Sequence, residues 1–328
     1  MNPNLQQKLA LFAQNTQTIK KEFRWQDTMT KWLAALFYAL EGQPVDCDAI
    51  QGAYTRIKET SGIFSAFRGN MALSLSALLA LSGNQETLFS DVLRVYEMLK
   101  KTKLRNSDFL VVAAYQIAAH GNAGQYPQIV ARTRTFFDGM KAKHWFLTGE
   151  DDYIFAAMLG LSAMDVSGGL ARMEQIFSRL KPEFRDGNSV QTLAQVLVLG
   201  ESTDDTLNRL LSLRGTLKEQ RLRLDKTYTL PSLGVLALLP ADTETIVRDI
   251  GEAQSFLRTQ KGFGRFSVDT QTLPLFSASI VAHAYAENLK DDVLTASLAT
   301  SILNIIIAQE TAMIAAICAS SAAAAASN

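Results

Sequence analysis

Three consecutive acids precede an aromatic residue and a long apolar run in the stretch GEDDYIFAAML, where they are Glu150, Asp151 and Asp152, followed by Tyr153. Clustered carboxylates can hold a metal ion, or act as general acid and base when burial raises the pKa of one of them. Aspartate beside an apolar helix also has a simpler role, because it accepts hydrogen bonds from the free backbone amides of the first turn. The stretch therefore indicates either a site or the beginning of a helix.

A second acid, Asp269, precedes another apolar segment, and together with Asp152 it forms our candidate catalytic pair. Glycosidases use two carboxyl groups roughly 5–10 Å apart, one as an acid and the other as a base or nucleophile. Such a pair would make the protein a hydrolase. Helix capping explains the same two residues, so the catalytic pair is an alternative and not the main prediction.

Metal, cofactor and thiol chemistry have little support in the sequence. The three histidines lie in different segments, without an HExxH motif or other ligand spacing, so we expect no metal site and no cofactor. The only cysteines are Cys47 and Cys318. Asp46 and Asp48 flank the first of them and disfavour its thiolate. We expect two reduced thiols.

The composition is that of an ordinary globular protein, with 48% hydrophobic residues and a balance of 32 basic and 32 acidic residues. A balanced charge without a basic cluster gives no field to attract nucleic acid, so no nucleic-acid partner is expected. The first residues lack the basic and then apolar pattern of a signal peptide. We expect a cytoplasmic protein.

The segment 293–319 carries Glu310 as its only charged residue and is long enough to span a bilayer. Its polar residues Asn304 and Gln309, its serines and threonines, and the absence of flanking aromatic belts argue against a membrane span. We expect a helix that is buried or that forms a homo-oligomer. Residues 320–328 are expected to form a flexible tail.

Apolar residues recur at helical spacing through the chain, and alternating strand patterns are nearly absent. Six helices with one charged face are expected to end in a cation, which favours the negative end of the helix dipole. These cations follow one another at intervals of 37 to 42 residues and are Lys58, Lys100, Lys141, Lys181, Lys218 and Arg258. We call these helices the charged helices.

Shorter apolar segments alternate with the charged helices, and we call them the apolar helices. They are expected at 32–40, 71–81, 109–119, 153–161, 190–199, 230–238 and 275–286. The alternation predicts an all-α fold of αα-hairpin repeats of about 40 residues in two layers, as an α/α toroid or an open α-superhelix. We expect one domain over 1–328, with a capping helix at 1–24, hairpins at 25–290, an apolar C-terminal helix at 291–319 and then the tail.

In such an array every apolar helix begins at the same rim, where a ligand-binding mouth could form. The polar residues predicted to line it are Arg68, Asn70, Asp151, Asp152, Tyr153, Asn188, Gln191, Tyr228 and Gln271. Helix capping explains many such positions equally well. Arg68 has two interpretations, an anion site with the amides behind it or an ion pair with a neighbouring acid.

Several blocks of the sequence together resemble one protein family. The blocks are NTQTIKKEFRWQ, FSAFRGN, HWFLTGEDDYIFAAMLGL, LDKTYTLPSLGVLALL and NIIIAQETAMIAA. They resemble the family of Gram-positive bacterial proteins catalogued as domain of unknown function 4003, over nearly the whole chain and in the expected order. The resemblance implies a soluble bacterial protein of about this length, and it implies no activity, cofactor or catalytic residue.

Three hypotheses for function follow. The first is a helical-repeat protein that binds a peptide, protein or small ligand at the rim of its apolar helices. The second is an α/α-toroid hydrolase that uses Asp152 and Asp269. The third is an accessory protein that packs against a membrane through its C-terminal helix.

Overall fold

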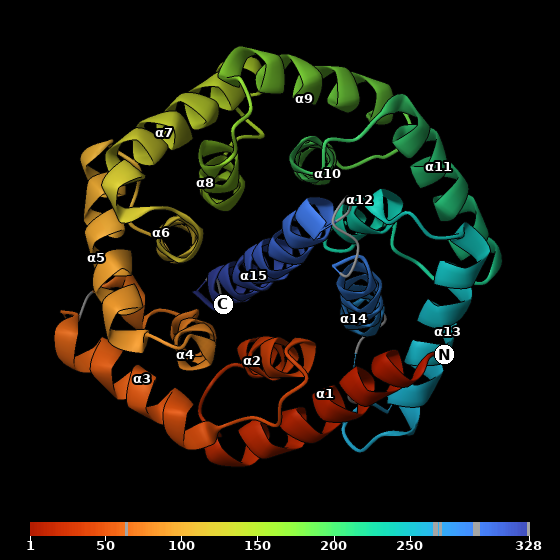
Figure 1. Cartoon of the computed structure of the whole chain (residues 1–328), viewed down its shortest axis with the longest axis horizontal. Coiled ribbons are helices and arrows are strands. Elements are labelled where there is room, and N and C mark those ends of the chain that lie inside the picture. The colour runs from red at the N-terminus through yellow and green to blue at the C-terminus, as the bar shows by residue number, and fades with distance from the viewer. Residues whose placement is uncertain (63–64, 265–267, 269–270, 291–295, 327–328) are drawn as a thin grey trace. The chain divides into compact units, whose positions relative to one another are not determined.

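The computed structural model describes residues 1–62, 65–264, 268, 271–290 and 296–326. These residues form fifteen α-helices, three short 3-10 helices and no β-strand, so the protein is all-α (Figure 1). The chain is organised as two compact units. Unit 1 comprises Met1–Gln17, Tyr38–Pro44 and Arg172–Gln309, and unit 2 comprises Thr18–Phe37, Val45–Ala171 and Glu310–Asn328. One continuous domain over 1–328 stays a prediction.

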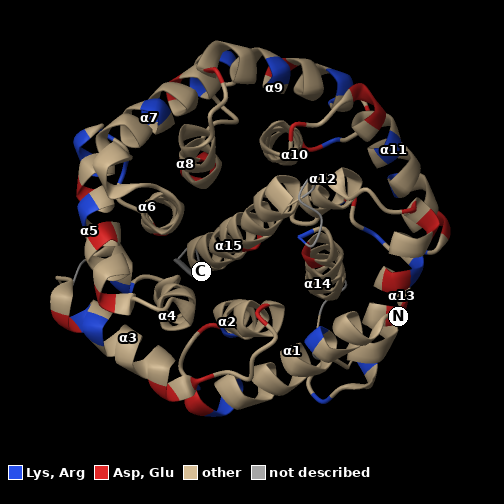
Figure 2. Ribbon diagram, viewed as in Figure 1, with Lys and Arg blue, Asp and Glu red and all other residues tan. Residues whose placement is uncertain are grey.

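Each predicted apolar segment lies largely within one α-helix of the described chain. These apolar helices are α2 (Thr28–Leu40), α4 (Ala72–Leu81), α6 (Asp108–His120), α8 (Tyr153–Leu161), α10 (Gly187–Leu199), α12 (Leu230–Leu238) and α14 (Thr272–Asn288). Every residue of α12 is buried. Figure 2 shows almost no charge on α4, α8, α10 and α12, and these helices are largely buried. A helix that is apolar on all sides is stable only inside a protein.

The charged helices alternate with the apolar ones. They are α3 (Cys47–Thr60), α5 (Gln85–Lys101), α7 (Tyr126–Lys143), α9 (Val166–Leu180), α11 (Asp204–Glu219) and α13 (Thr243–Thr259), preceded by the N-terminal helix α1 (Pro3–Glu22). Five of the six predicted cations lie in a last helical turn. Lys181 instead follows the end of α9, where its ammonium donates to the carbonyl oxygen of Arg185 at 3.2 Å.

Within each unit, neighbouring charged and apolar helices pack in pairs. In unit 2, α3 packs on α4, α5 on α6 and α7 on α8; in unit 1, α11 packs on α12 and α13 on α14. The apolar helices also contact one another, α6 with α8 and α12 with both α10 and α14. The apolar helices α6, α8, α12 and α14 are therefore each covered by a charged helix and by a neighbouring apolar helix.

An arginine recurs on the charged helices and contacts the chain beyond the following apolar helix. The guanidinium of Arg132 donates to carbonyl oxygens around the end of α8, that of Arg172 to one after α10, and that of Arg209 to one after α12. The acceptors are Gly160 (3.1 Å), Ser162 (2.9 Å) and Met164 (2.6 Å) for Arg132, Ser202 (3.1 Å) for Arg172, and Ala241 for Arg209. These bonds satisfy carbonyl groups that a helix end leaves without partners.

Arg56 and Arg94 hold the corresponding positions on α3 and α5. Arg56 forms an ion pair of 2.8 Å with Glu86 in the first turn of α5, and the Arg94 guanidinium lies 5.8 Å from the centre of the Tyr126 ring. The five arginines follow one another at intervals of 37 to 40 residues. The same residue type thus recurs at this spacing, with carbonyl oxygens as partners in three cases, an acid for Arg56 and an aromatic ring for Arg94.

Arg132 is expected to contribute more to stability than Arg56. Arg132→Ala should lower the free energy of unfolding by about 2–3 kcal/mol, because three carbonyl groups lose a charged donor. Arg56→Ala should cost less than about 1 kcal/mol, since the side chains of Arg56 and Glu86 are 41% and 82% exposed. Urea unfolding followed by circular dichroism measures both, and equal losses would contradict a capping role for Arg132.

The last helix is α15 (Ala296–Ala326), which continues through residues 320–326, where a flexible tail was expected. The part of it from Ala296 to Ala324 is long and apolar enough to cross a membrane by length and composition, the one such helix among the described residues. However, 72% of its apolar window is buried, and the core helix of a soluble protein passes the same test.

Candidate functional site

Asp152 and Tyr153 are occupied in closing the start of α8. Asp152 is 2% exposed, and its Oδ2 accepts a hydrogen bond of 2.8 Å from the backbone N–H of Gly149. The Tyr153 hydroxyl accepts one of 3.2 Å from the backbone N–H of Arg105, and its ring meets Phe137 edge-on with centroids 5.0 Å apart. Asp151 is half-buried in the same turn. Their contacts are those of a folded helix start.

The candidate catalytic pair cannot be assembled from the described chain. Asp269 lies outside the described residues. Asp152, its proposed partner, is buried and bonded as a cap. The pair stays a prediction that no described contact favours.

Arg68 contacts the end of the preceding helix, and its two predicted roles stay predictions. Its guanidinium donates to the carbonyl oxygens of Lys58 and Ser61, the latter at 2.7 Å, at the end of α3. A cation at the negative end of a helix stabilises the free carbonyl groups there. Asn70 is exposed nearby, and its backbone N–H bonds the carboxylate of Asp108. Both positions therefore belong to the joint between helices in unit 2.

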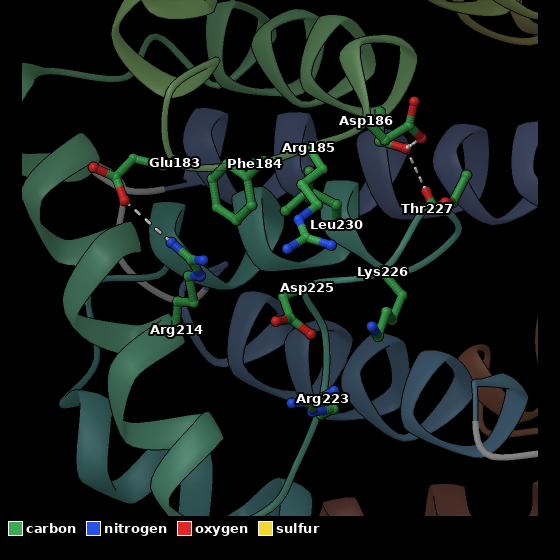
Figure 3. A pocket seen from close by; sticks show the side chains of 11 residues that line it. Glu183, Phe184, Arg185, Asp186, Arg214, Arg223, Asp225, Lys226, Thr227 and Leu230 are labelled. Atoms are coloured by element: carbon green, nitrogen blue, oxygen red, sulfur yellow. Dashed lines mark hydrogen bonds and ion pairs between the residues drawn. The ribbon is translucent and has the colours of Figure 1, made fainter.

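Unit 1 contains a cavity of about 440 Å³ beside the loops that precede α10 and α12 (Figure 3). Seven of its eleven lining residues are charged, and Phe184 and Leu230 supply an apolar part of the wall. The lining residues are Glu183, Phe184, Arg185, Asp186, Ser189, Arg214, Arg223, Asp225, Lys226, Thr227 and Leu230. A ligand-binding mouth is predicted at such loops, but its predicted lining residues do not include the cations of this cavity.

One side of this cavity is held by contacts between its own lining residues. Arg214 forms an ion pair of 3.2 Å with Glu183, and its guanidinium lies 4.5 Å from the centre of the buried Phe184 ring. On the other side, the Ser189 hydroxyl lies 2.8 Å from the carbonyl oxygen of Thr227 and also bonds the Asp186 carboxylate. These residues shape the wall, and their charged groups already have ion-pair, aromatic or hydrogen-bond partners within it.

Three cations of the cavity lack such partners. Among the residues that the structure describes, Arg185, Arg223 and Lys226 have no acid within ion-pair distance, and all three are exposed. The Asp225 carboxylate lines the same space, and its buried Oδ1 has no hydrogen-bond partner there. Figure 3 shows Arg185 on the loop before α10 and Asp225 on the loop before α12 at the same cavity. An anionic group with a hydrogen-bond donor beside it would complement this arrangement.

A second cavity of about 340 Å³ shares Arg223 and Lys226 with the first. Its other lining residues are Arg221, Gln254, Arg258, Gln271 and Pro274, so no acid lines it among the residues that the structure describes. Arg258 is already engaged with backbone carbonyl groups, of Phe263 at 3.1 Å among others. The amide nitrogen of Gln254 is buried without a partner among the described residues. The shared cations would allow one ligand to extend over both cavities.

The ligand-binding residues predicted in unit 1 are only partly placed at these cavities. Gln271, exposed before α14, lines the second cavity. Asn188 and Tyr228 are half-buried and Gln191 is 2% exposed, and none of the three lines either cavity. The signal that could have found the site is the cluster of cations in the loops before α10 and α12.

The described residues offer little for chemistry beyond binding. No group of three His, Cys, Asp or Glu side chains among them lies as a metal site would. Burial and the nearby Glu22, Asp46 and Asp48 raise the pKa of Cys47 to about 11. Burial and Asp27 raise the pKa of Cys318 to about 12. Neither thiol is a ready nucleophile at neutral pH.

Comparison with known proteins gives one match. The model of the family described as "Protein of unknown function (DUF4003)" matches residues 15–312. No curated protein and no solved structure matches the chain.

Proposed function

We propose that this chain, which belongs to the DUF4003 family, is a binding protein that takes up a small anionic molecule in unit 1. The observation that carries the proposal is the set of three unpaired cations, Arg185, Arg223 and Lys226, around one cavity of about 440 Å³. Small-molecule sites have volumes of about 300–1,000 Å³ and use a few convergent polar groups to fix the ligand.

The architecture behind this proposal is an array of αα-hairpins in two layers. The pairing of charged with apolar helices within each unit supports it, as do the arginines that recur at intervals of 37 to 40 residues. Such an array is either an open superhelix or a closed α/α toroid. In both, loops that follow charged helices form a shared rim, and the cavity of unit 1 lies beside two of these loops.

The chemistry of the cavity favours an anion over a neutral molecule. Charge-assisted hydrogen bonds from guanidinium and ammonium groups to phosphate or carboxylate are about twice as strong as neutral ones. The free oxygen of Asp225 would accept a bond from a hydroxyl or ammonium group of the same ligand. We therefore favour a phosphorylated or carboxylated molecule that also carries a hydrogen-bond donor.

Calorimetric titration with simple probes tests the proposal. We expect pyrophosphate, citrate or glucose 6-phosphate to bind, and glucose to fail to bind. The double variant Arg223→Gln/Lys226→Gln should weaken that binding about tenfold or more, because both cavities lose their shared cations.

A matched control distinguishes the site from general charge. Lys218→Gln removes an exposed cation from the last turn of α11, outside both linings, and should bind the probes as the wild type does. If none of the anionic probes binds, or if the double variant binds them as tightly as the wild type, the anion site is refuted.

A further inference from the structure

Three large aromatic side chains of unit 2 are exposed to solvent. Trp25 is 98% exposed, Trp145 is 74% exposed and Phe146 is 71% exposed. Trp145 and Phe146 touch only edge-on, with ring centroids 5.8 Å apart. Leaving rings of this size in water forgoes the free energy of burying them, so exposed aromatic groups indicate a binding surface.

All three rings lie in loops that lead from a charged helix or from α1 into an apolar helix. We call the described residues of the four such loops of unit 2, at 23–27, at 61–62 with 65–71, at 102–107 and at 144–152, its lead-in loops. Trp25 lies in the first and Trp145 and Phe146 lie in the last. The aromatic groups therefore mark both ends of one series of loops.

Backbone contacts place the second, third and fourth lead-in loops at one end of unit 2. The backbone N–H groups of Asn70 and Met71, before α4, bond the carboxylate of Asp108 at the start of α6. The N–H of Arg105, before α6, donates to the hydroxyl of Tyr153 at the start of α8. Each of these three loops is thus tied to the next.

The first lead-in loop reaches the same end. The Cys318 thiol lies 3.5 Å from Oδ1 of Asp27, just before α2, and the charge of Asp108 also acts on that thiol. Asp27 and Asp108 are therefore close to one side chain. All four loops, with their three exposed rings, lie at one end of unit 2.

This end also carries exposed cations that have no acidic partner. They are Arg24, Lys101, Lys103, Arg105 and Lys143, on the lead-in loops or in the adjacent last helical turns. No acid lies within ion-pair distance of any of them among the described residues. The surface that includes the exposed rings therefore also carries positively charged side chains without acidic partners among the described residues.

Several acids at this end accept hydrogen bonds from backbone N–H groups at helix starts, although Asp27 itself is exposed. Asp27 accepts a bond of 2.7 Å from the N–H of Met29, and Asp108 and Asp152 accept comparable bonds at the other helix starts. Glu150 and Asp151 are half-buried. The loops at the other end of the hairpins, 82–84, 121–125 and 162–165, contain no lysine or arginine. The helix dipole accounts for part of this asymmetry, but it does not account for exposed tryptophan.

We propose that the lead-in loops of unit 2 dock on an anionic lipid bilayer. Trp25, Trp145 and Phe146 enter the headgroup region, where amphipathic aromatic rings are favoured, and the cations face lipid phosphates. A single weak membrane anchor gives only marginal binding, whereas the aromatic rings and the basic surface together supply two anchors. The rings are distributed over the first and last loops, which suits separate anchors better than the compact central cluster of a protein interface.

Vesicle cosedimentation tests this surface in the full-length protein. We expect binding to vesicles of phosphatidylcholine with one third phosphatidylglycerol, little binding to phosphatidylcholine alone, and weaker binding at high salt. Two of the three tryptophans are exposed rings of this surface, while Trp32 is 7% exposed. Tryptophan fluorescence should therefore shift to shorter wavelength when the vesicles bind.

Substitutions separate the contributions of rings and charge. Trp25→Ser/Trp145→Ser/Phe146→Ser should lower the partition coefficient about tenfold or more, and Lys101→Gln/Lys103→Gln should lower it about tenfold and flatten the salt dependence. Arg94→Gln, on the outer face of α5 and away from the lead-in loops, should leave binding unchanged.

Three results would overturn the proposal: no binding of the wild type to anionic vesicles at low salt, equal binding of the aromatic variant, or burial of the rings in a dimer. Sedimentation velocity of wild type and aromatic variant detects the last case. Because the anion cavity belongs to unit 1, its probes remain able to bind the aromatic variant, and failure here leaves that site testable on its own.

Discussion

Acidification from pH 7 to about pH 4.5 is expected to remove about 2.5 kcal/mol of unfolding free energy through His283 alone. His283 is 3% exposed on α14, and burial, reinforced by Lys8, lowers its pKa from 6.5 to about 3. The unfolded chain binds a proton near pH 6.5, while the folded protein does so only near pH 3. Between these values the unfolded state binds more protons, so stability falls as the pH falls.

The charged groups around His283 set the pH range in which its titration is measured apart from that of Glu287. The Lys8 ammonium lies 2.9 Å from Oε2 of Glu287, and Nδ1 of His283 lies 3.8 Å from the same oxygen. Lys290 also disfavours the charged imidazole, while Glu287 favours it. Burial opposes the ionised form of Glu287, but the hydrogen bonds from Lys8 and Asn4 and the charges of His283 and Lys8 together outweigh it and lower its pKa. The ionised Glu287 stabilises the fold, and this contribution is lost only when the pH falls below about 4.5, the ordinary pKa of the group.

His283→Gln removes the titrating ring and keeps a polar side chain of similar size. The variant should be less stable than the wild type at pH 7, and the difference should shrink by about 2.5 kcal/mol by about pH 4.5. Urea unfolding at a series of pH values gives both curves. Parallel curves for His283→Gln and wild type would show that His283 titrates alike in both states.

The positions of the helices were predictable from the sequence because helical periodicity is a local property. The expected segments 153–161 and 230–238 coincide with α8 and α12, and the cations expected at helix ends lie at or just beyond them. A boundary set only by composition was less reliable. The alanine-rich residues 320–326 continue α15 although no apolar periodicity requires them to, since alanine has the highest intrinsic helix propensity.

The site was less predictable because it depends on which side chains already have partners. Arg68 and Lys226 both precede an apolar helix, yet Arg68 is bonded to the end of α3 while Lys226 has no acidic partner among the described residues. Asp152 and Asp225 are likewise both acids in lead-in segments, and one is a buried cap while the other lines a cavity. Only the tertiary contacts distinguish the members of each pair.

The balanced charge of the whole chain concealed an uneven distribution. Equal numbers of acids and bases argued against an anionic partner, but the lead-in loops collect cations while loops such as 162–165 carry none. The expectation against a membrane partner considered a spanning segment and not a surface. Exposed residues such as Trp25 give no sequence signal of their exposure, because an aromatic residue is usually part of a core.

Gly160→Ala is expected to destabilise the protein by about 2 kcal/mol or more. Gly160 lies on α8 where that helix meets α7, and a β-carbon there would lie 2.9 Å from the backbone nitrogen of Thr133 and 3.0 Å from the carbonyl oxygen of Ile129. Backbone atoms of a packed helix cannot move aside as a flexible side chain can. Overpacking of this kind costs about 1–3 kcal/mol or more, which exceeds the gain of up to about 1 kcal/mol in helix propensity.

Gly215→Ala is the matched control, because Gly215 lies in α11 with nothing within 4 Å of its would-be β-carbon. This substitution should raise the free energy of unfolding by about 0.5–1 kcal/mol, since alanine loses less backbone entropy than glycine in a helix. Urea unfolding of the two variants should therefore shift the midpoint in opposite directions. If Gly160→Ala were as stable as Gly215→Ala, the close approach of α7 and α8 would be wrong, and with it the packing of helix pairs on which the binding proposals depend.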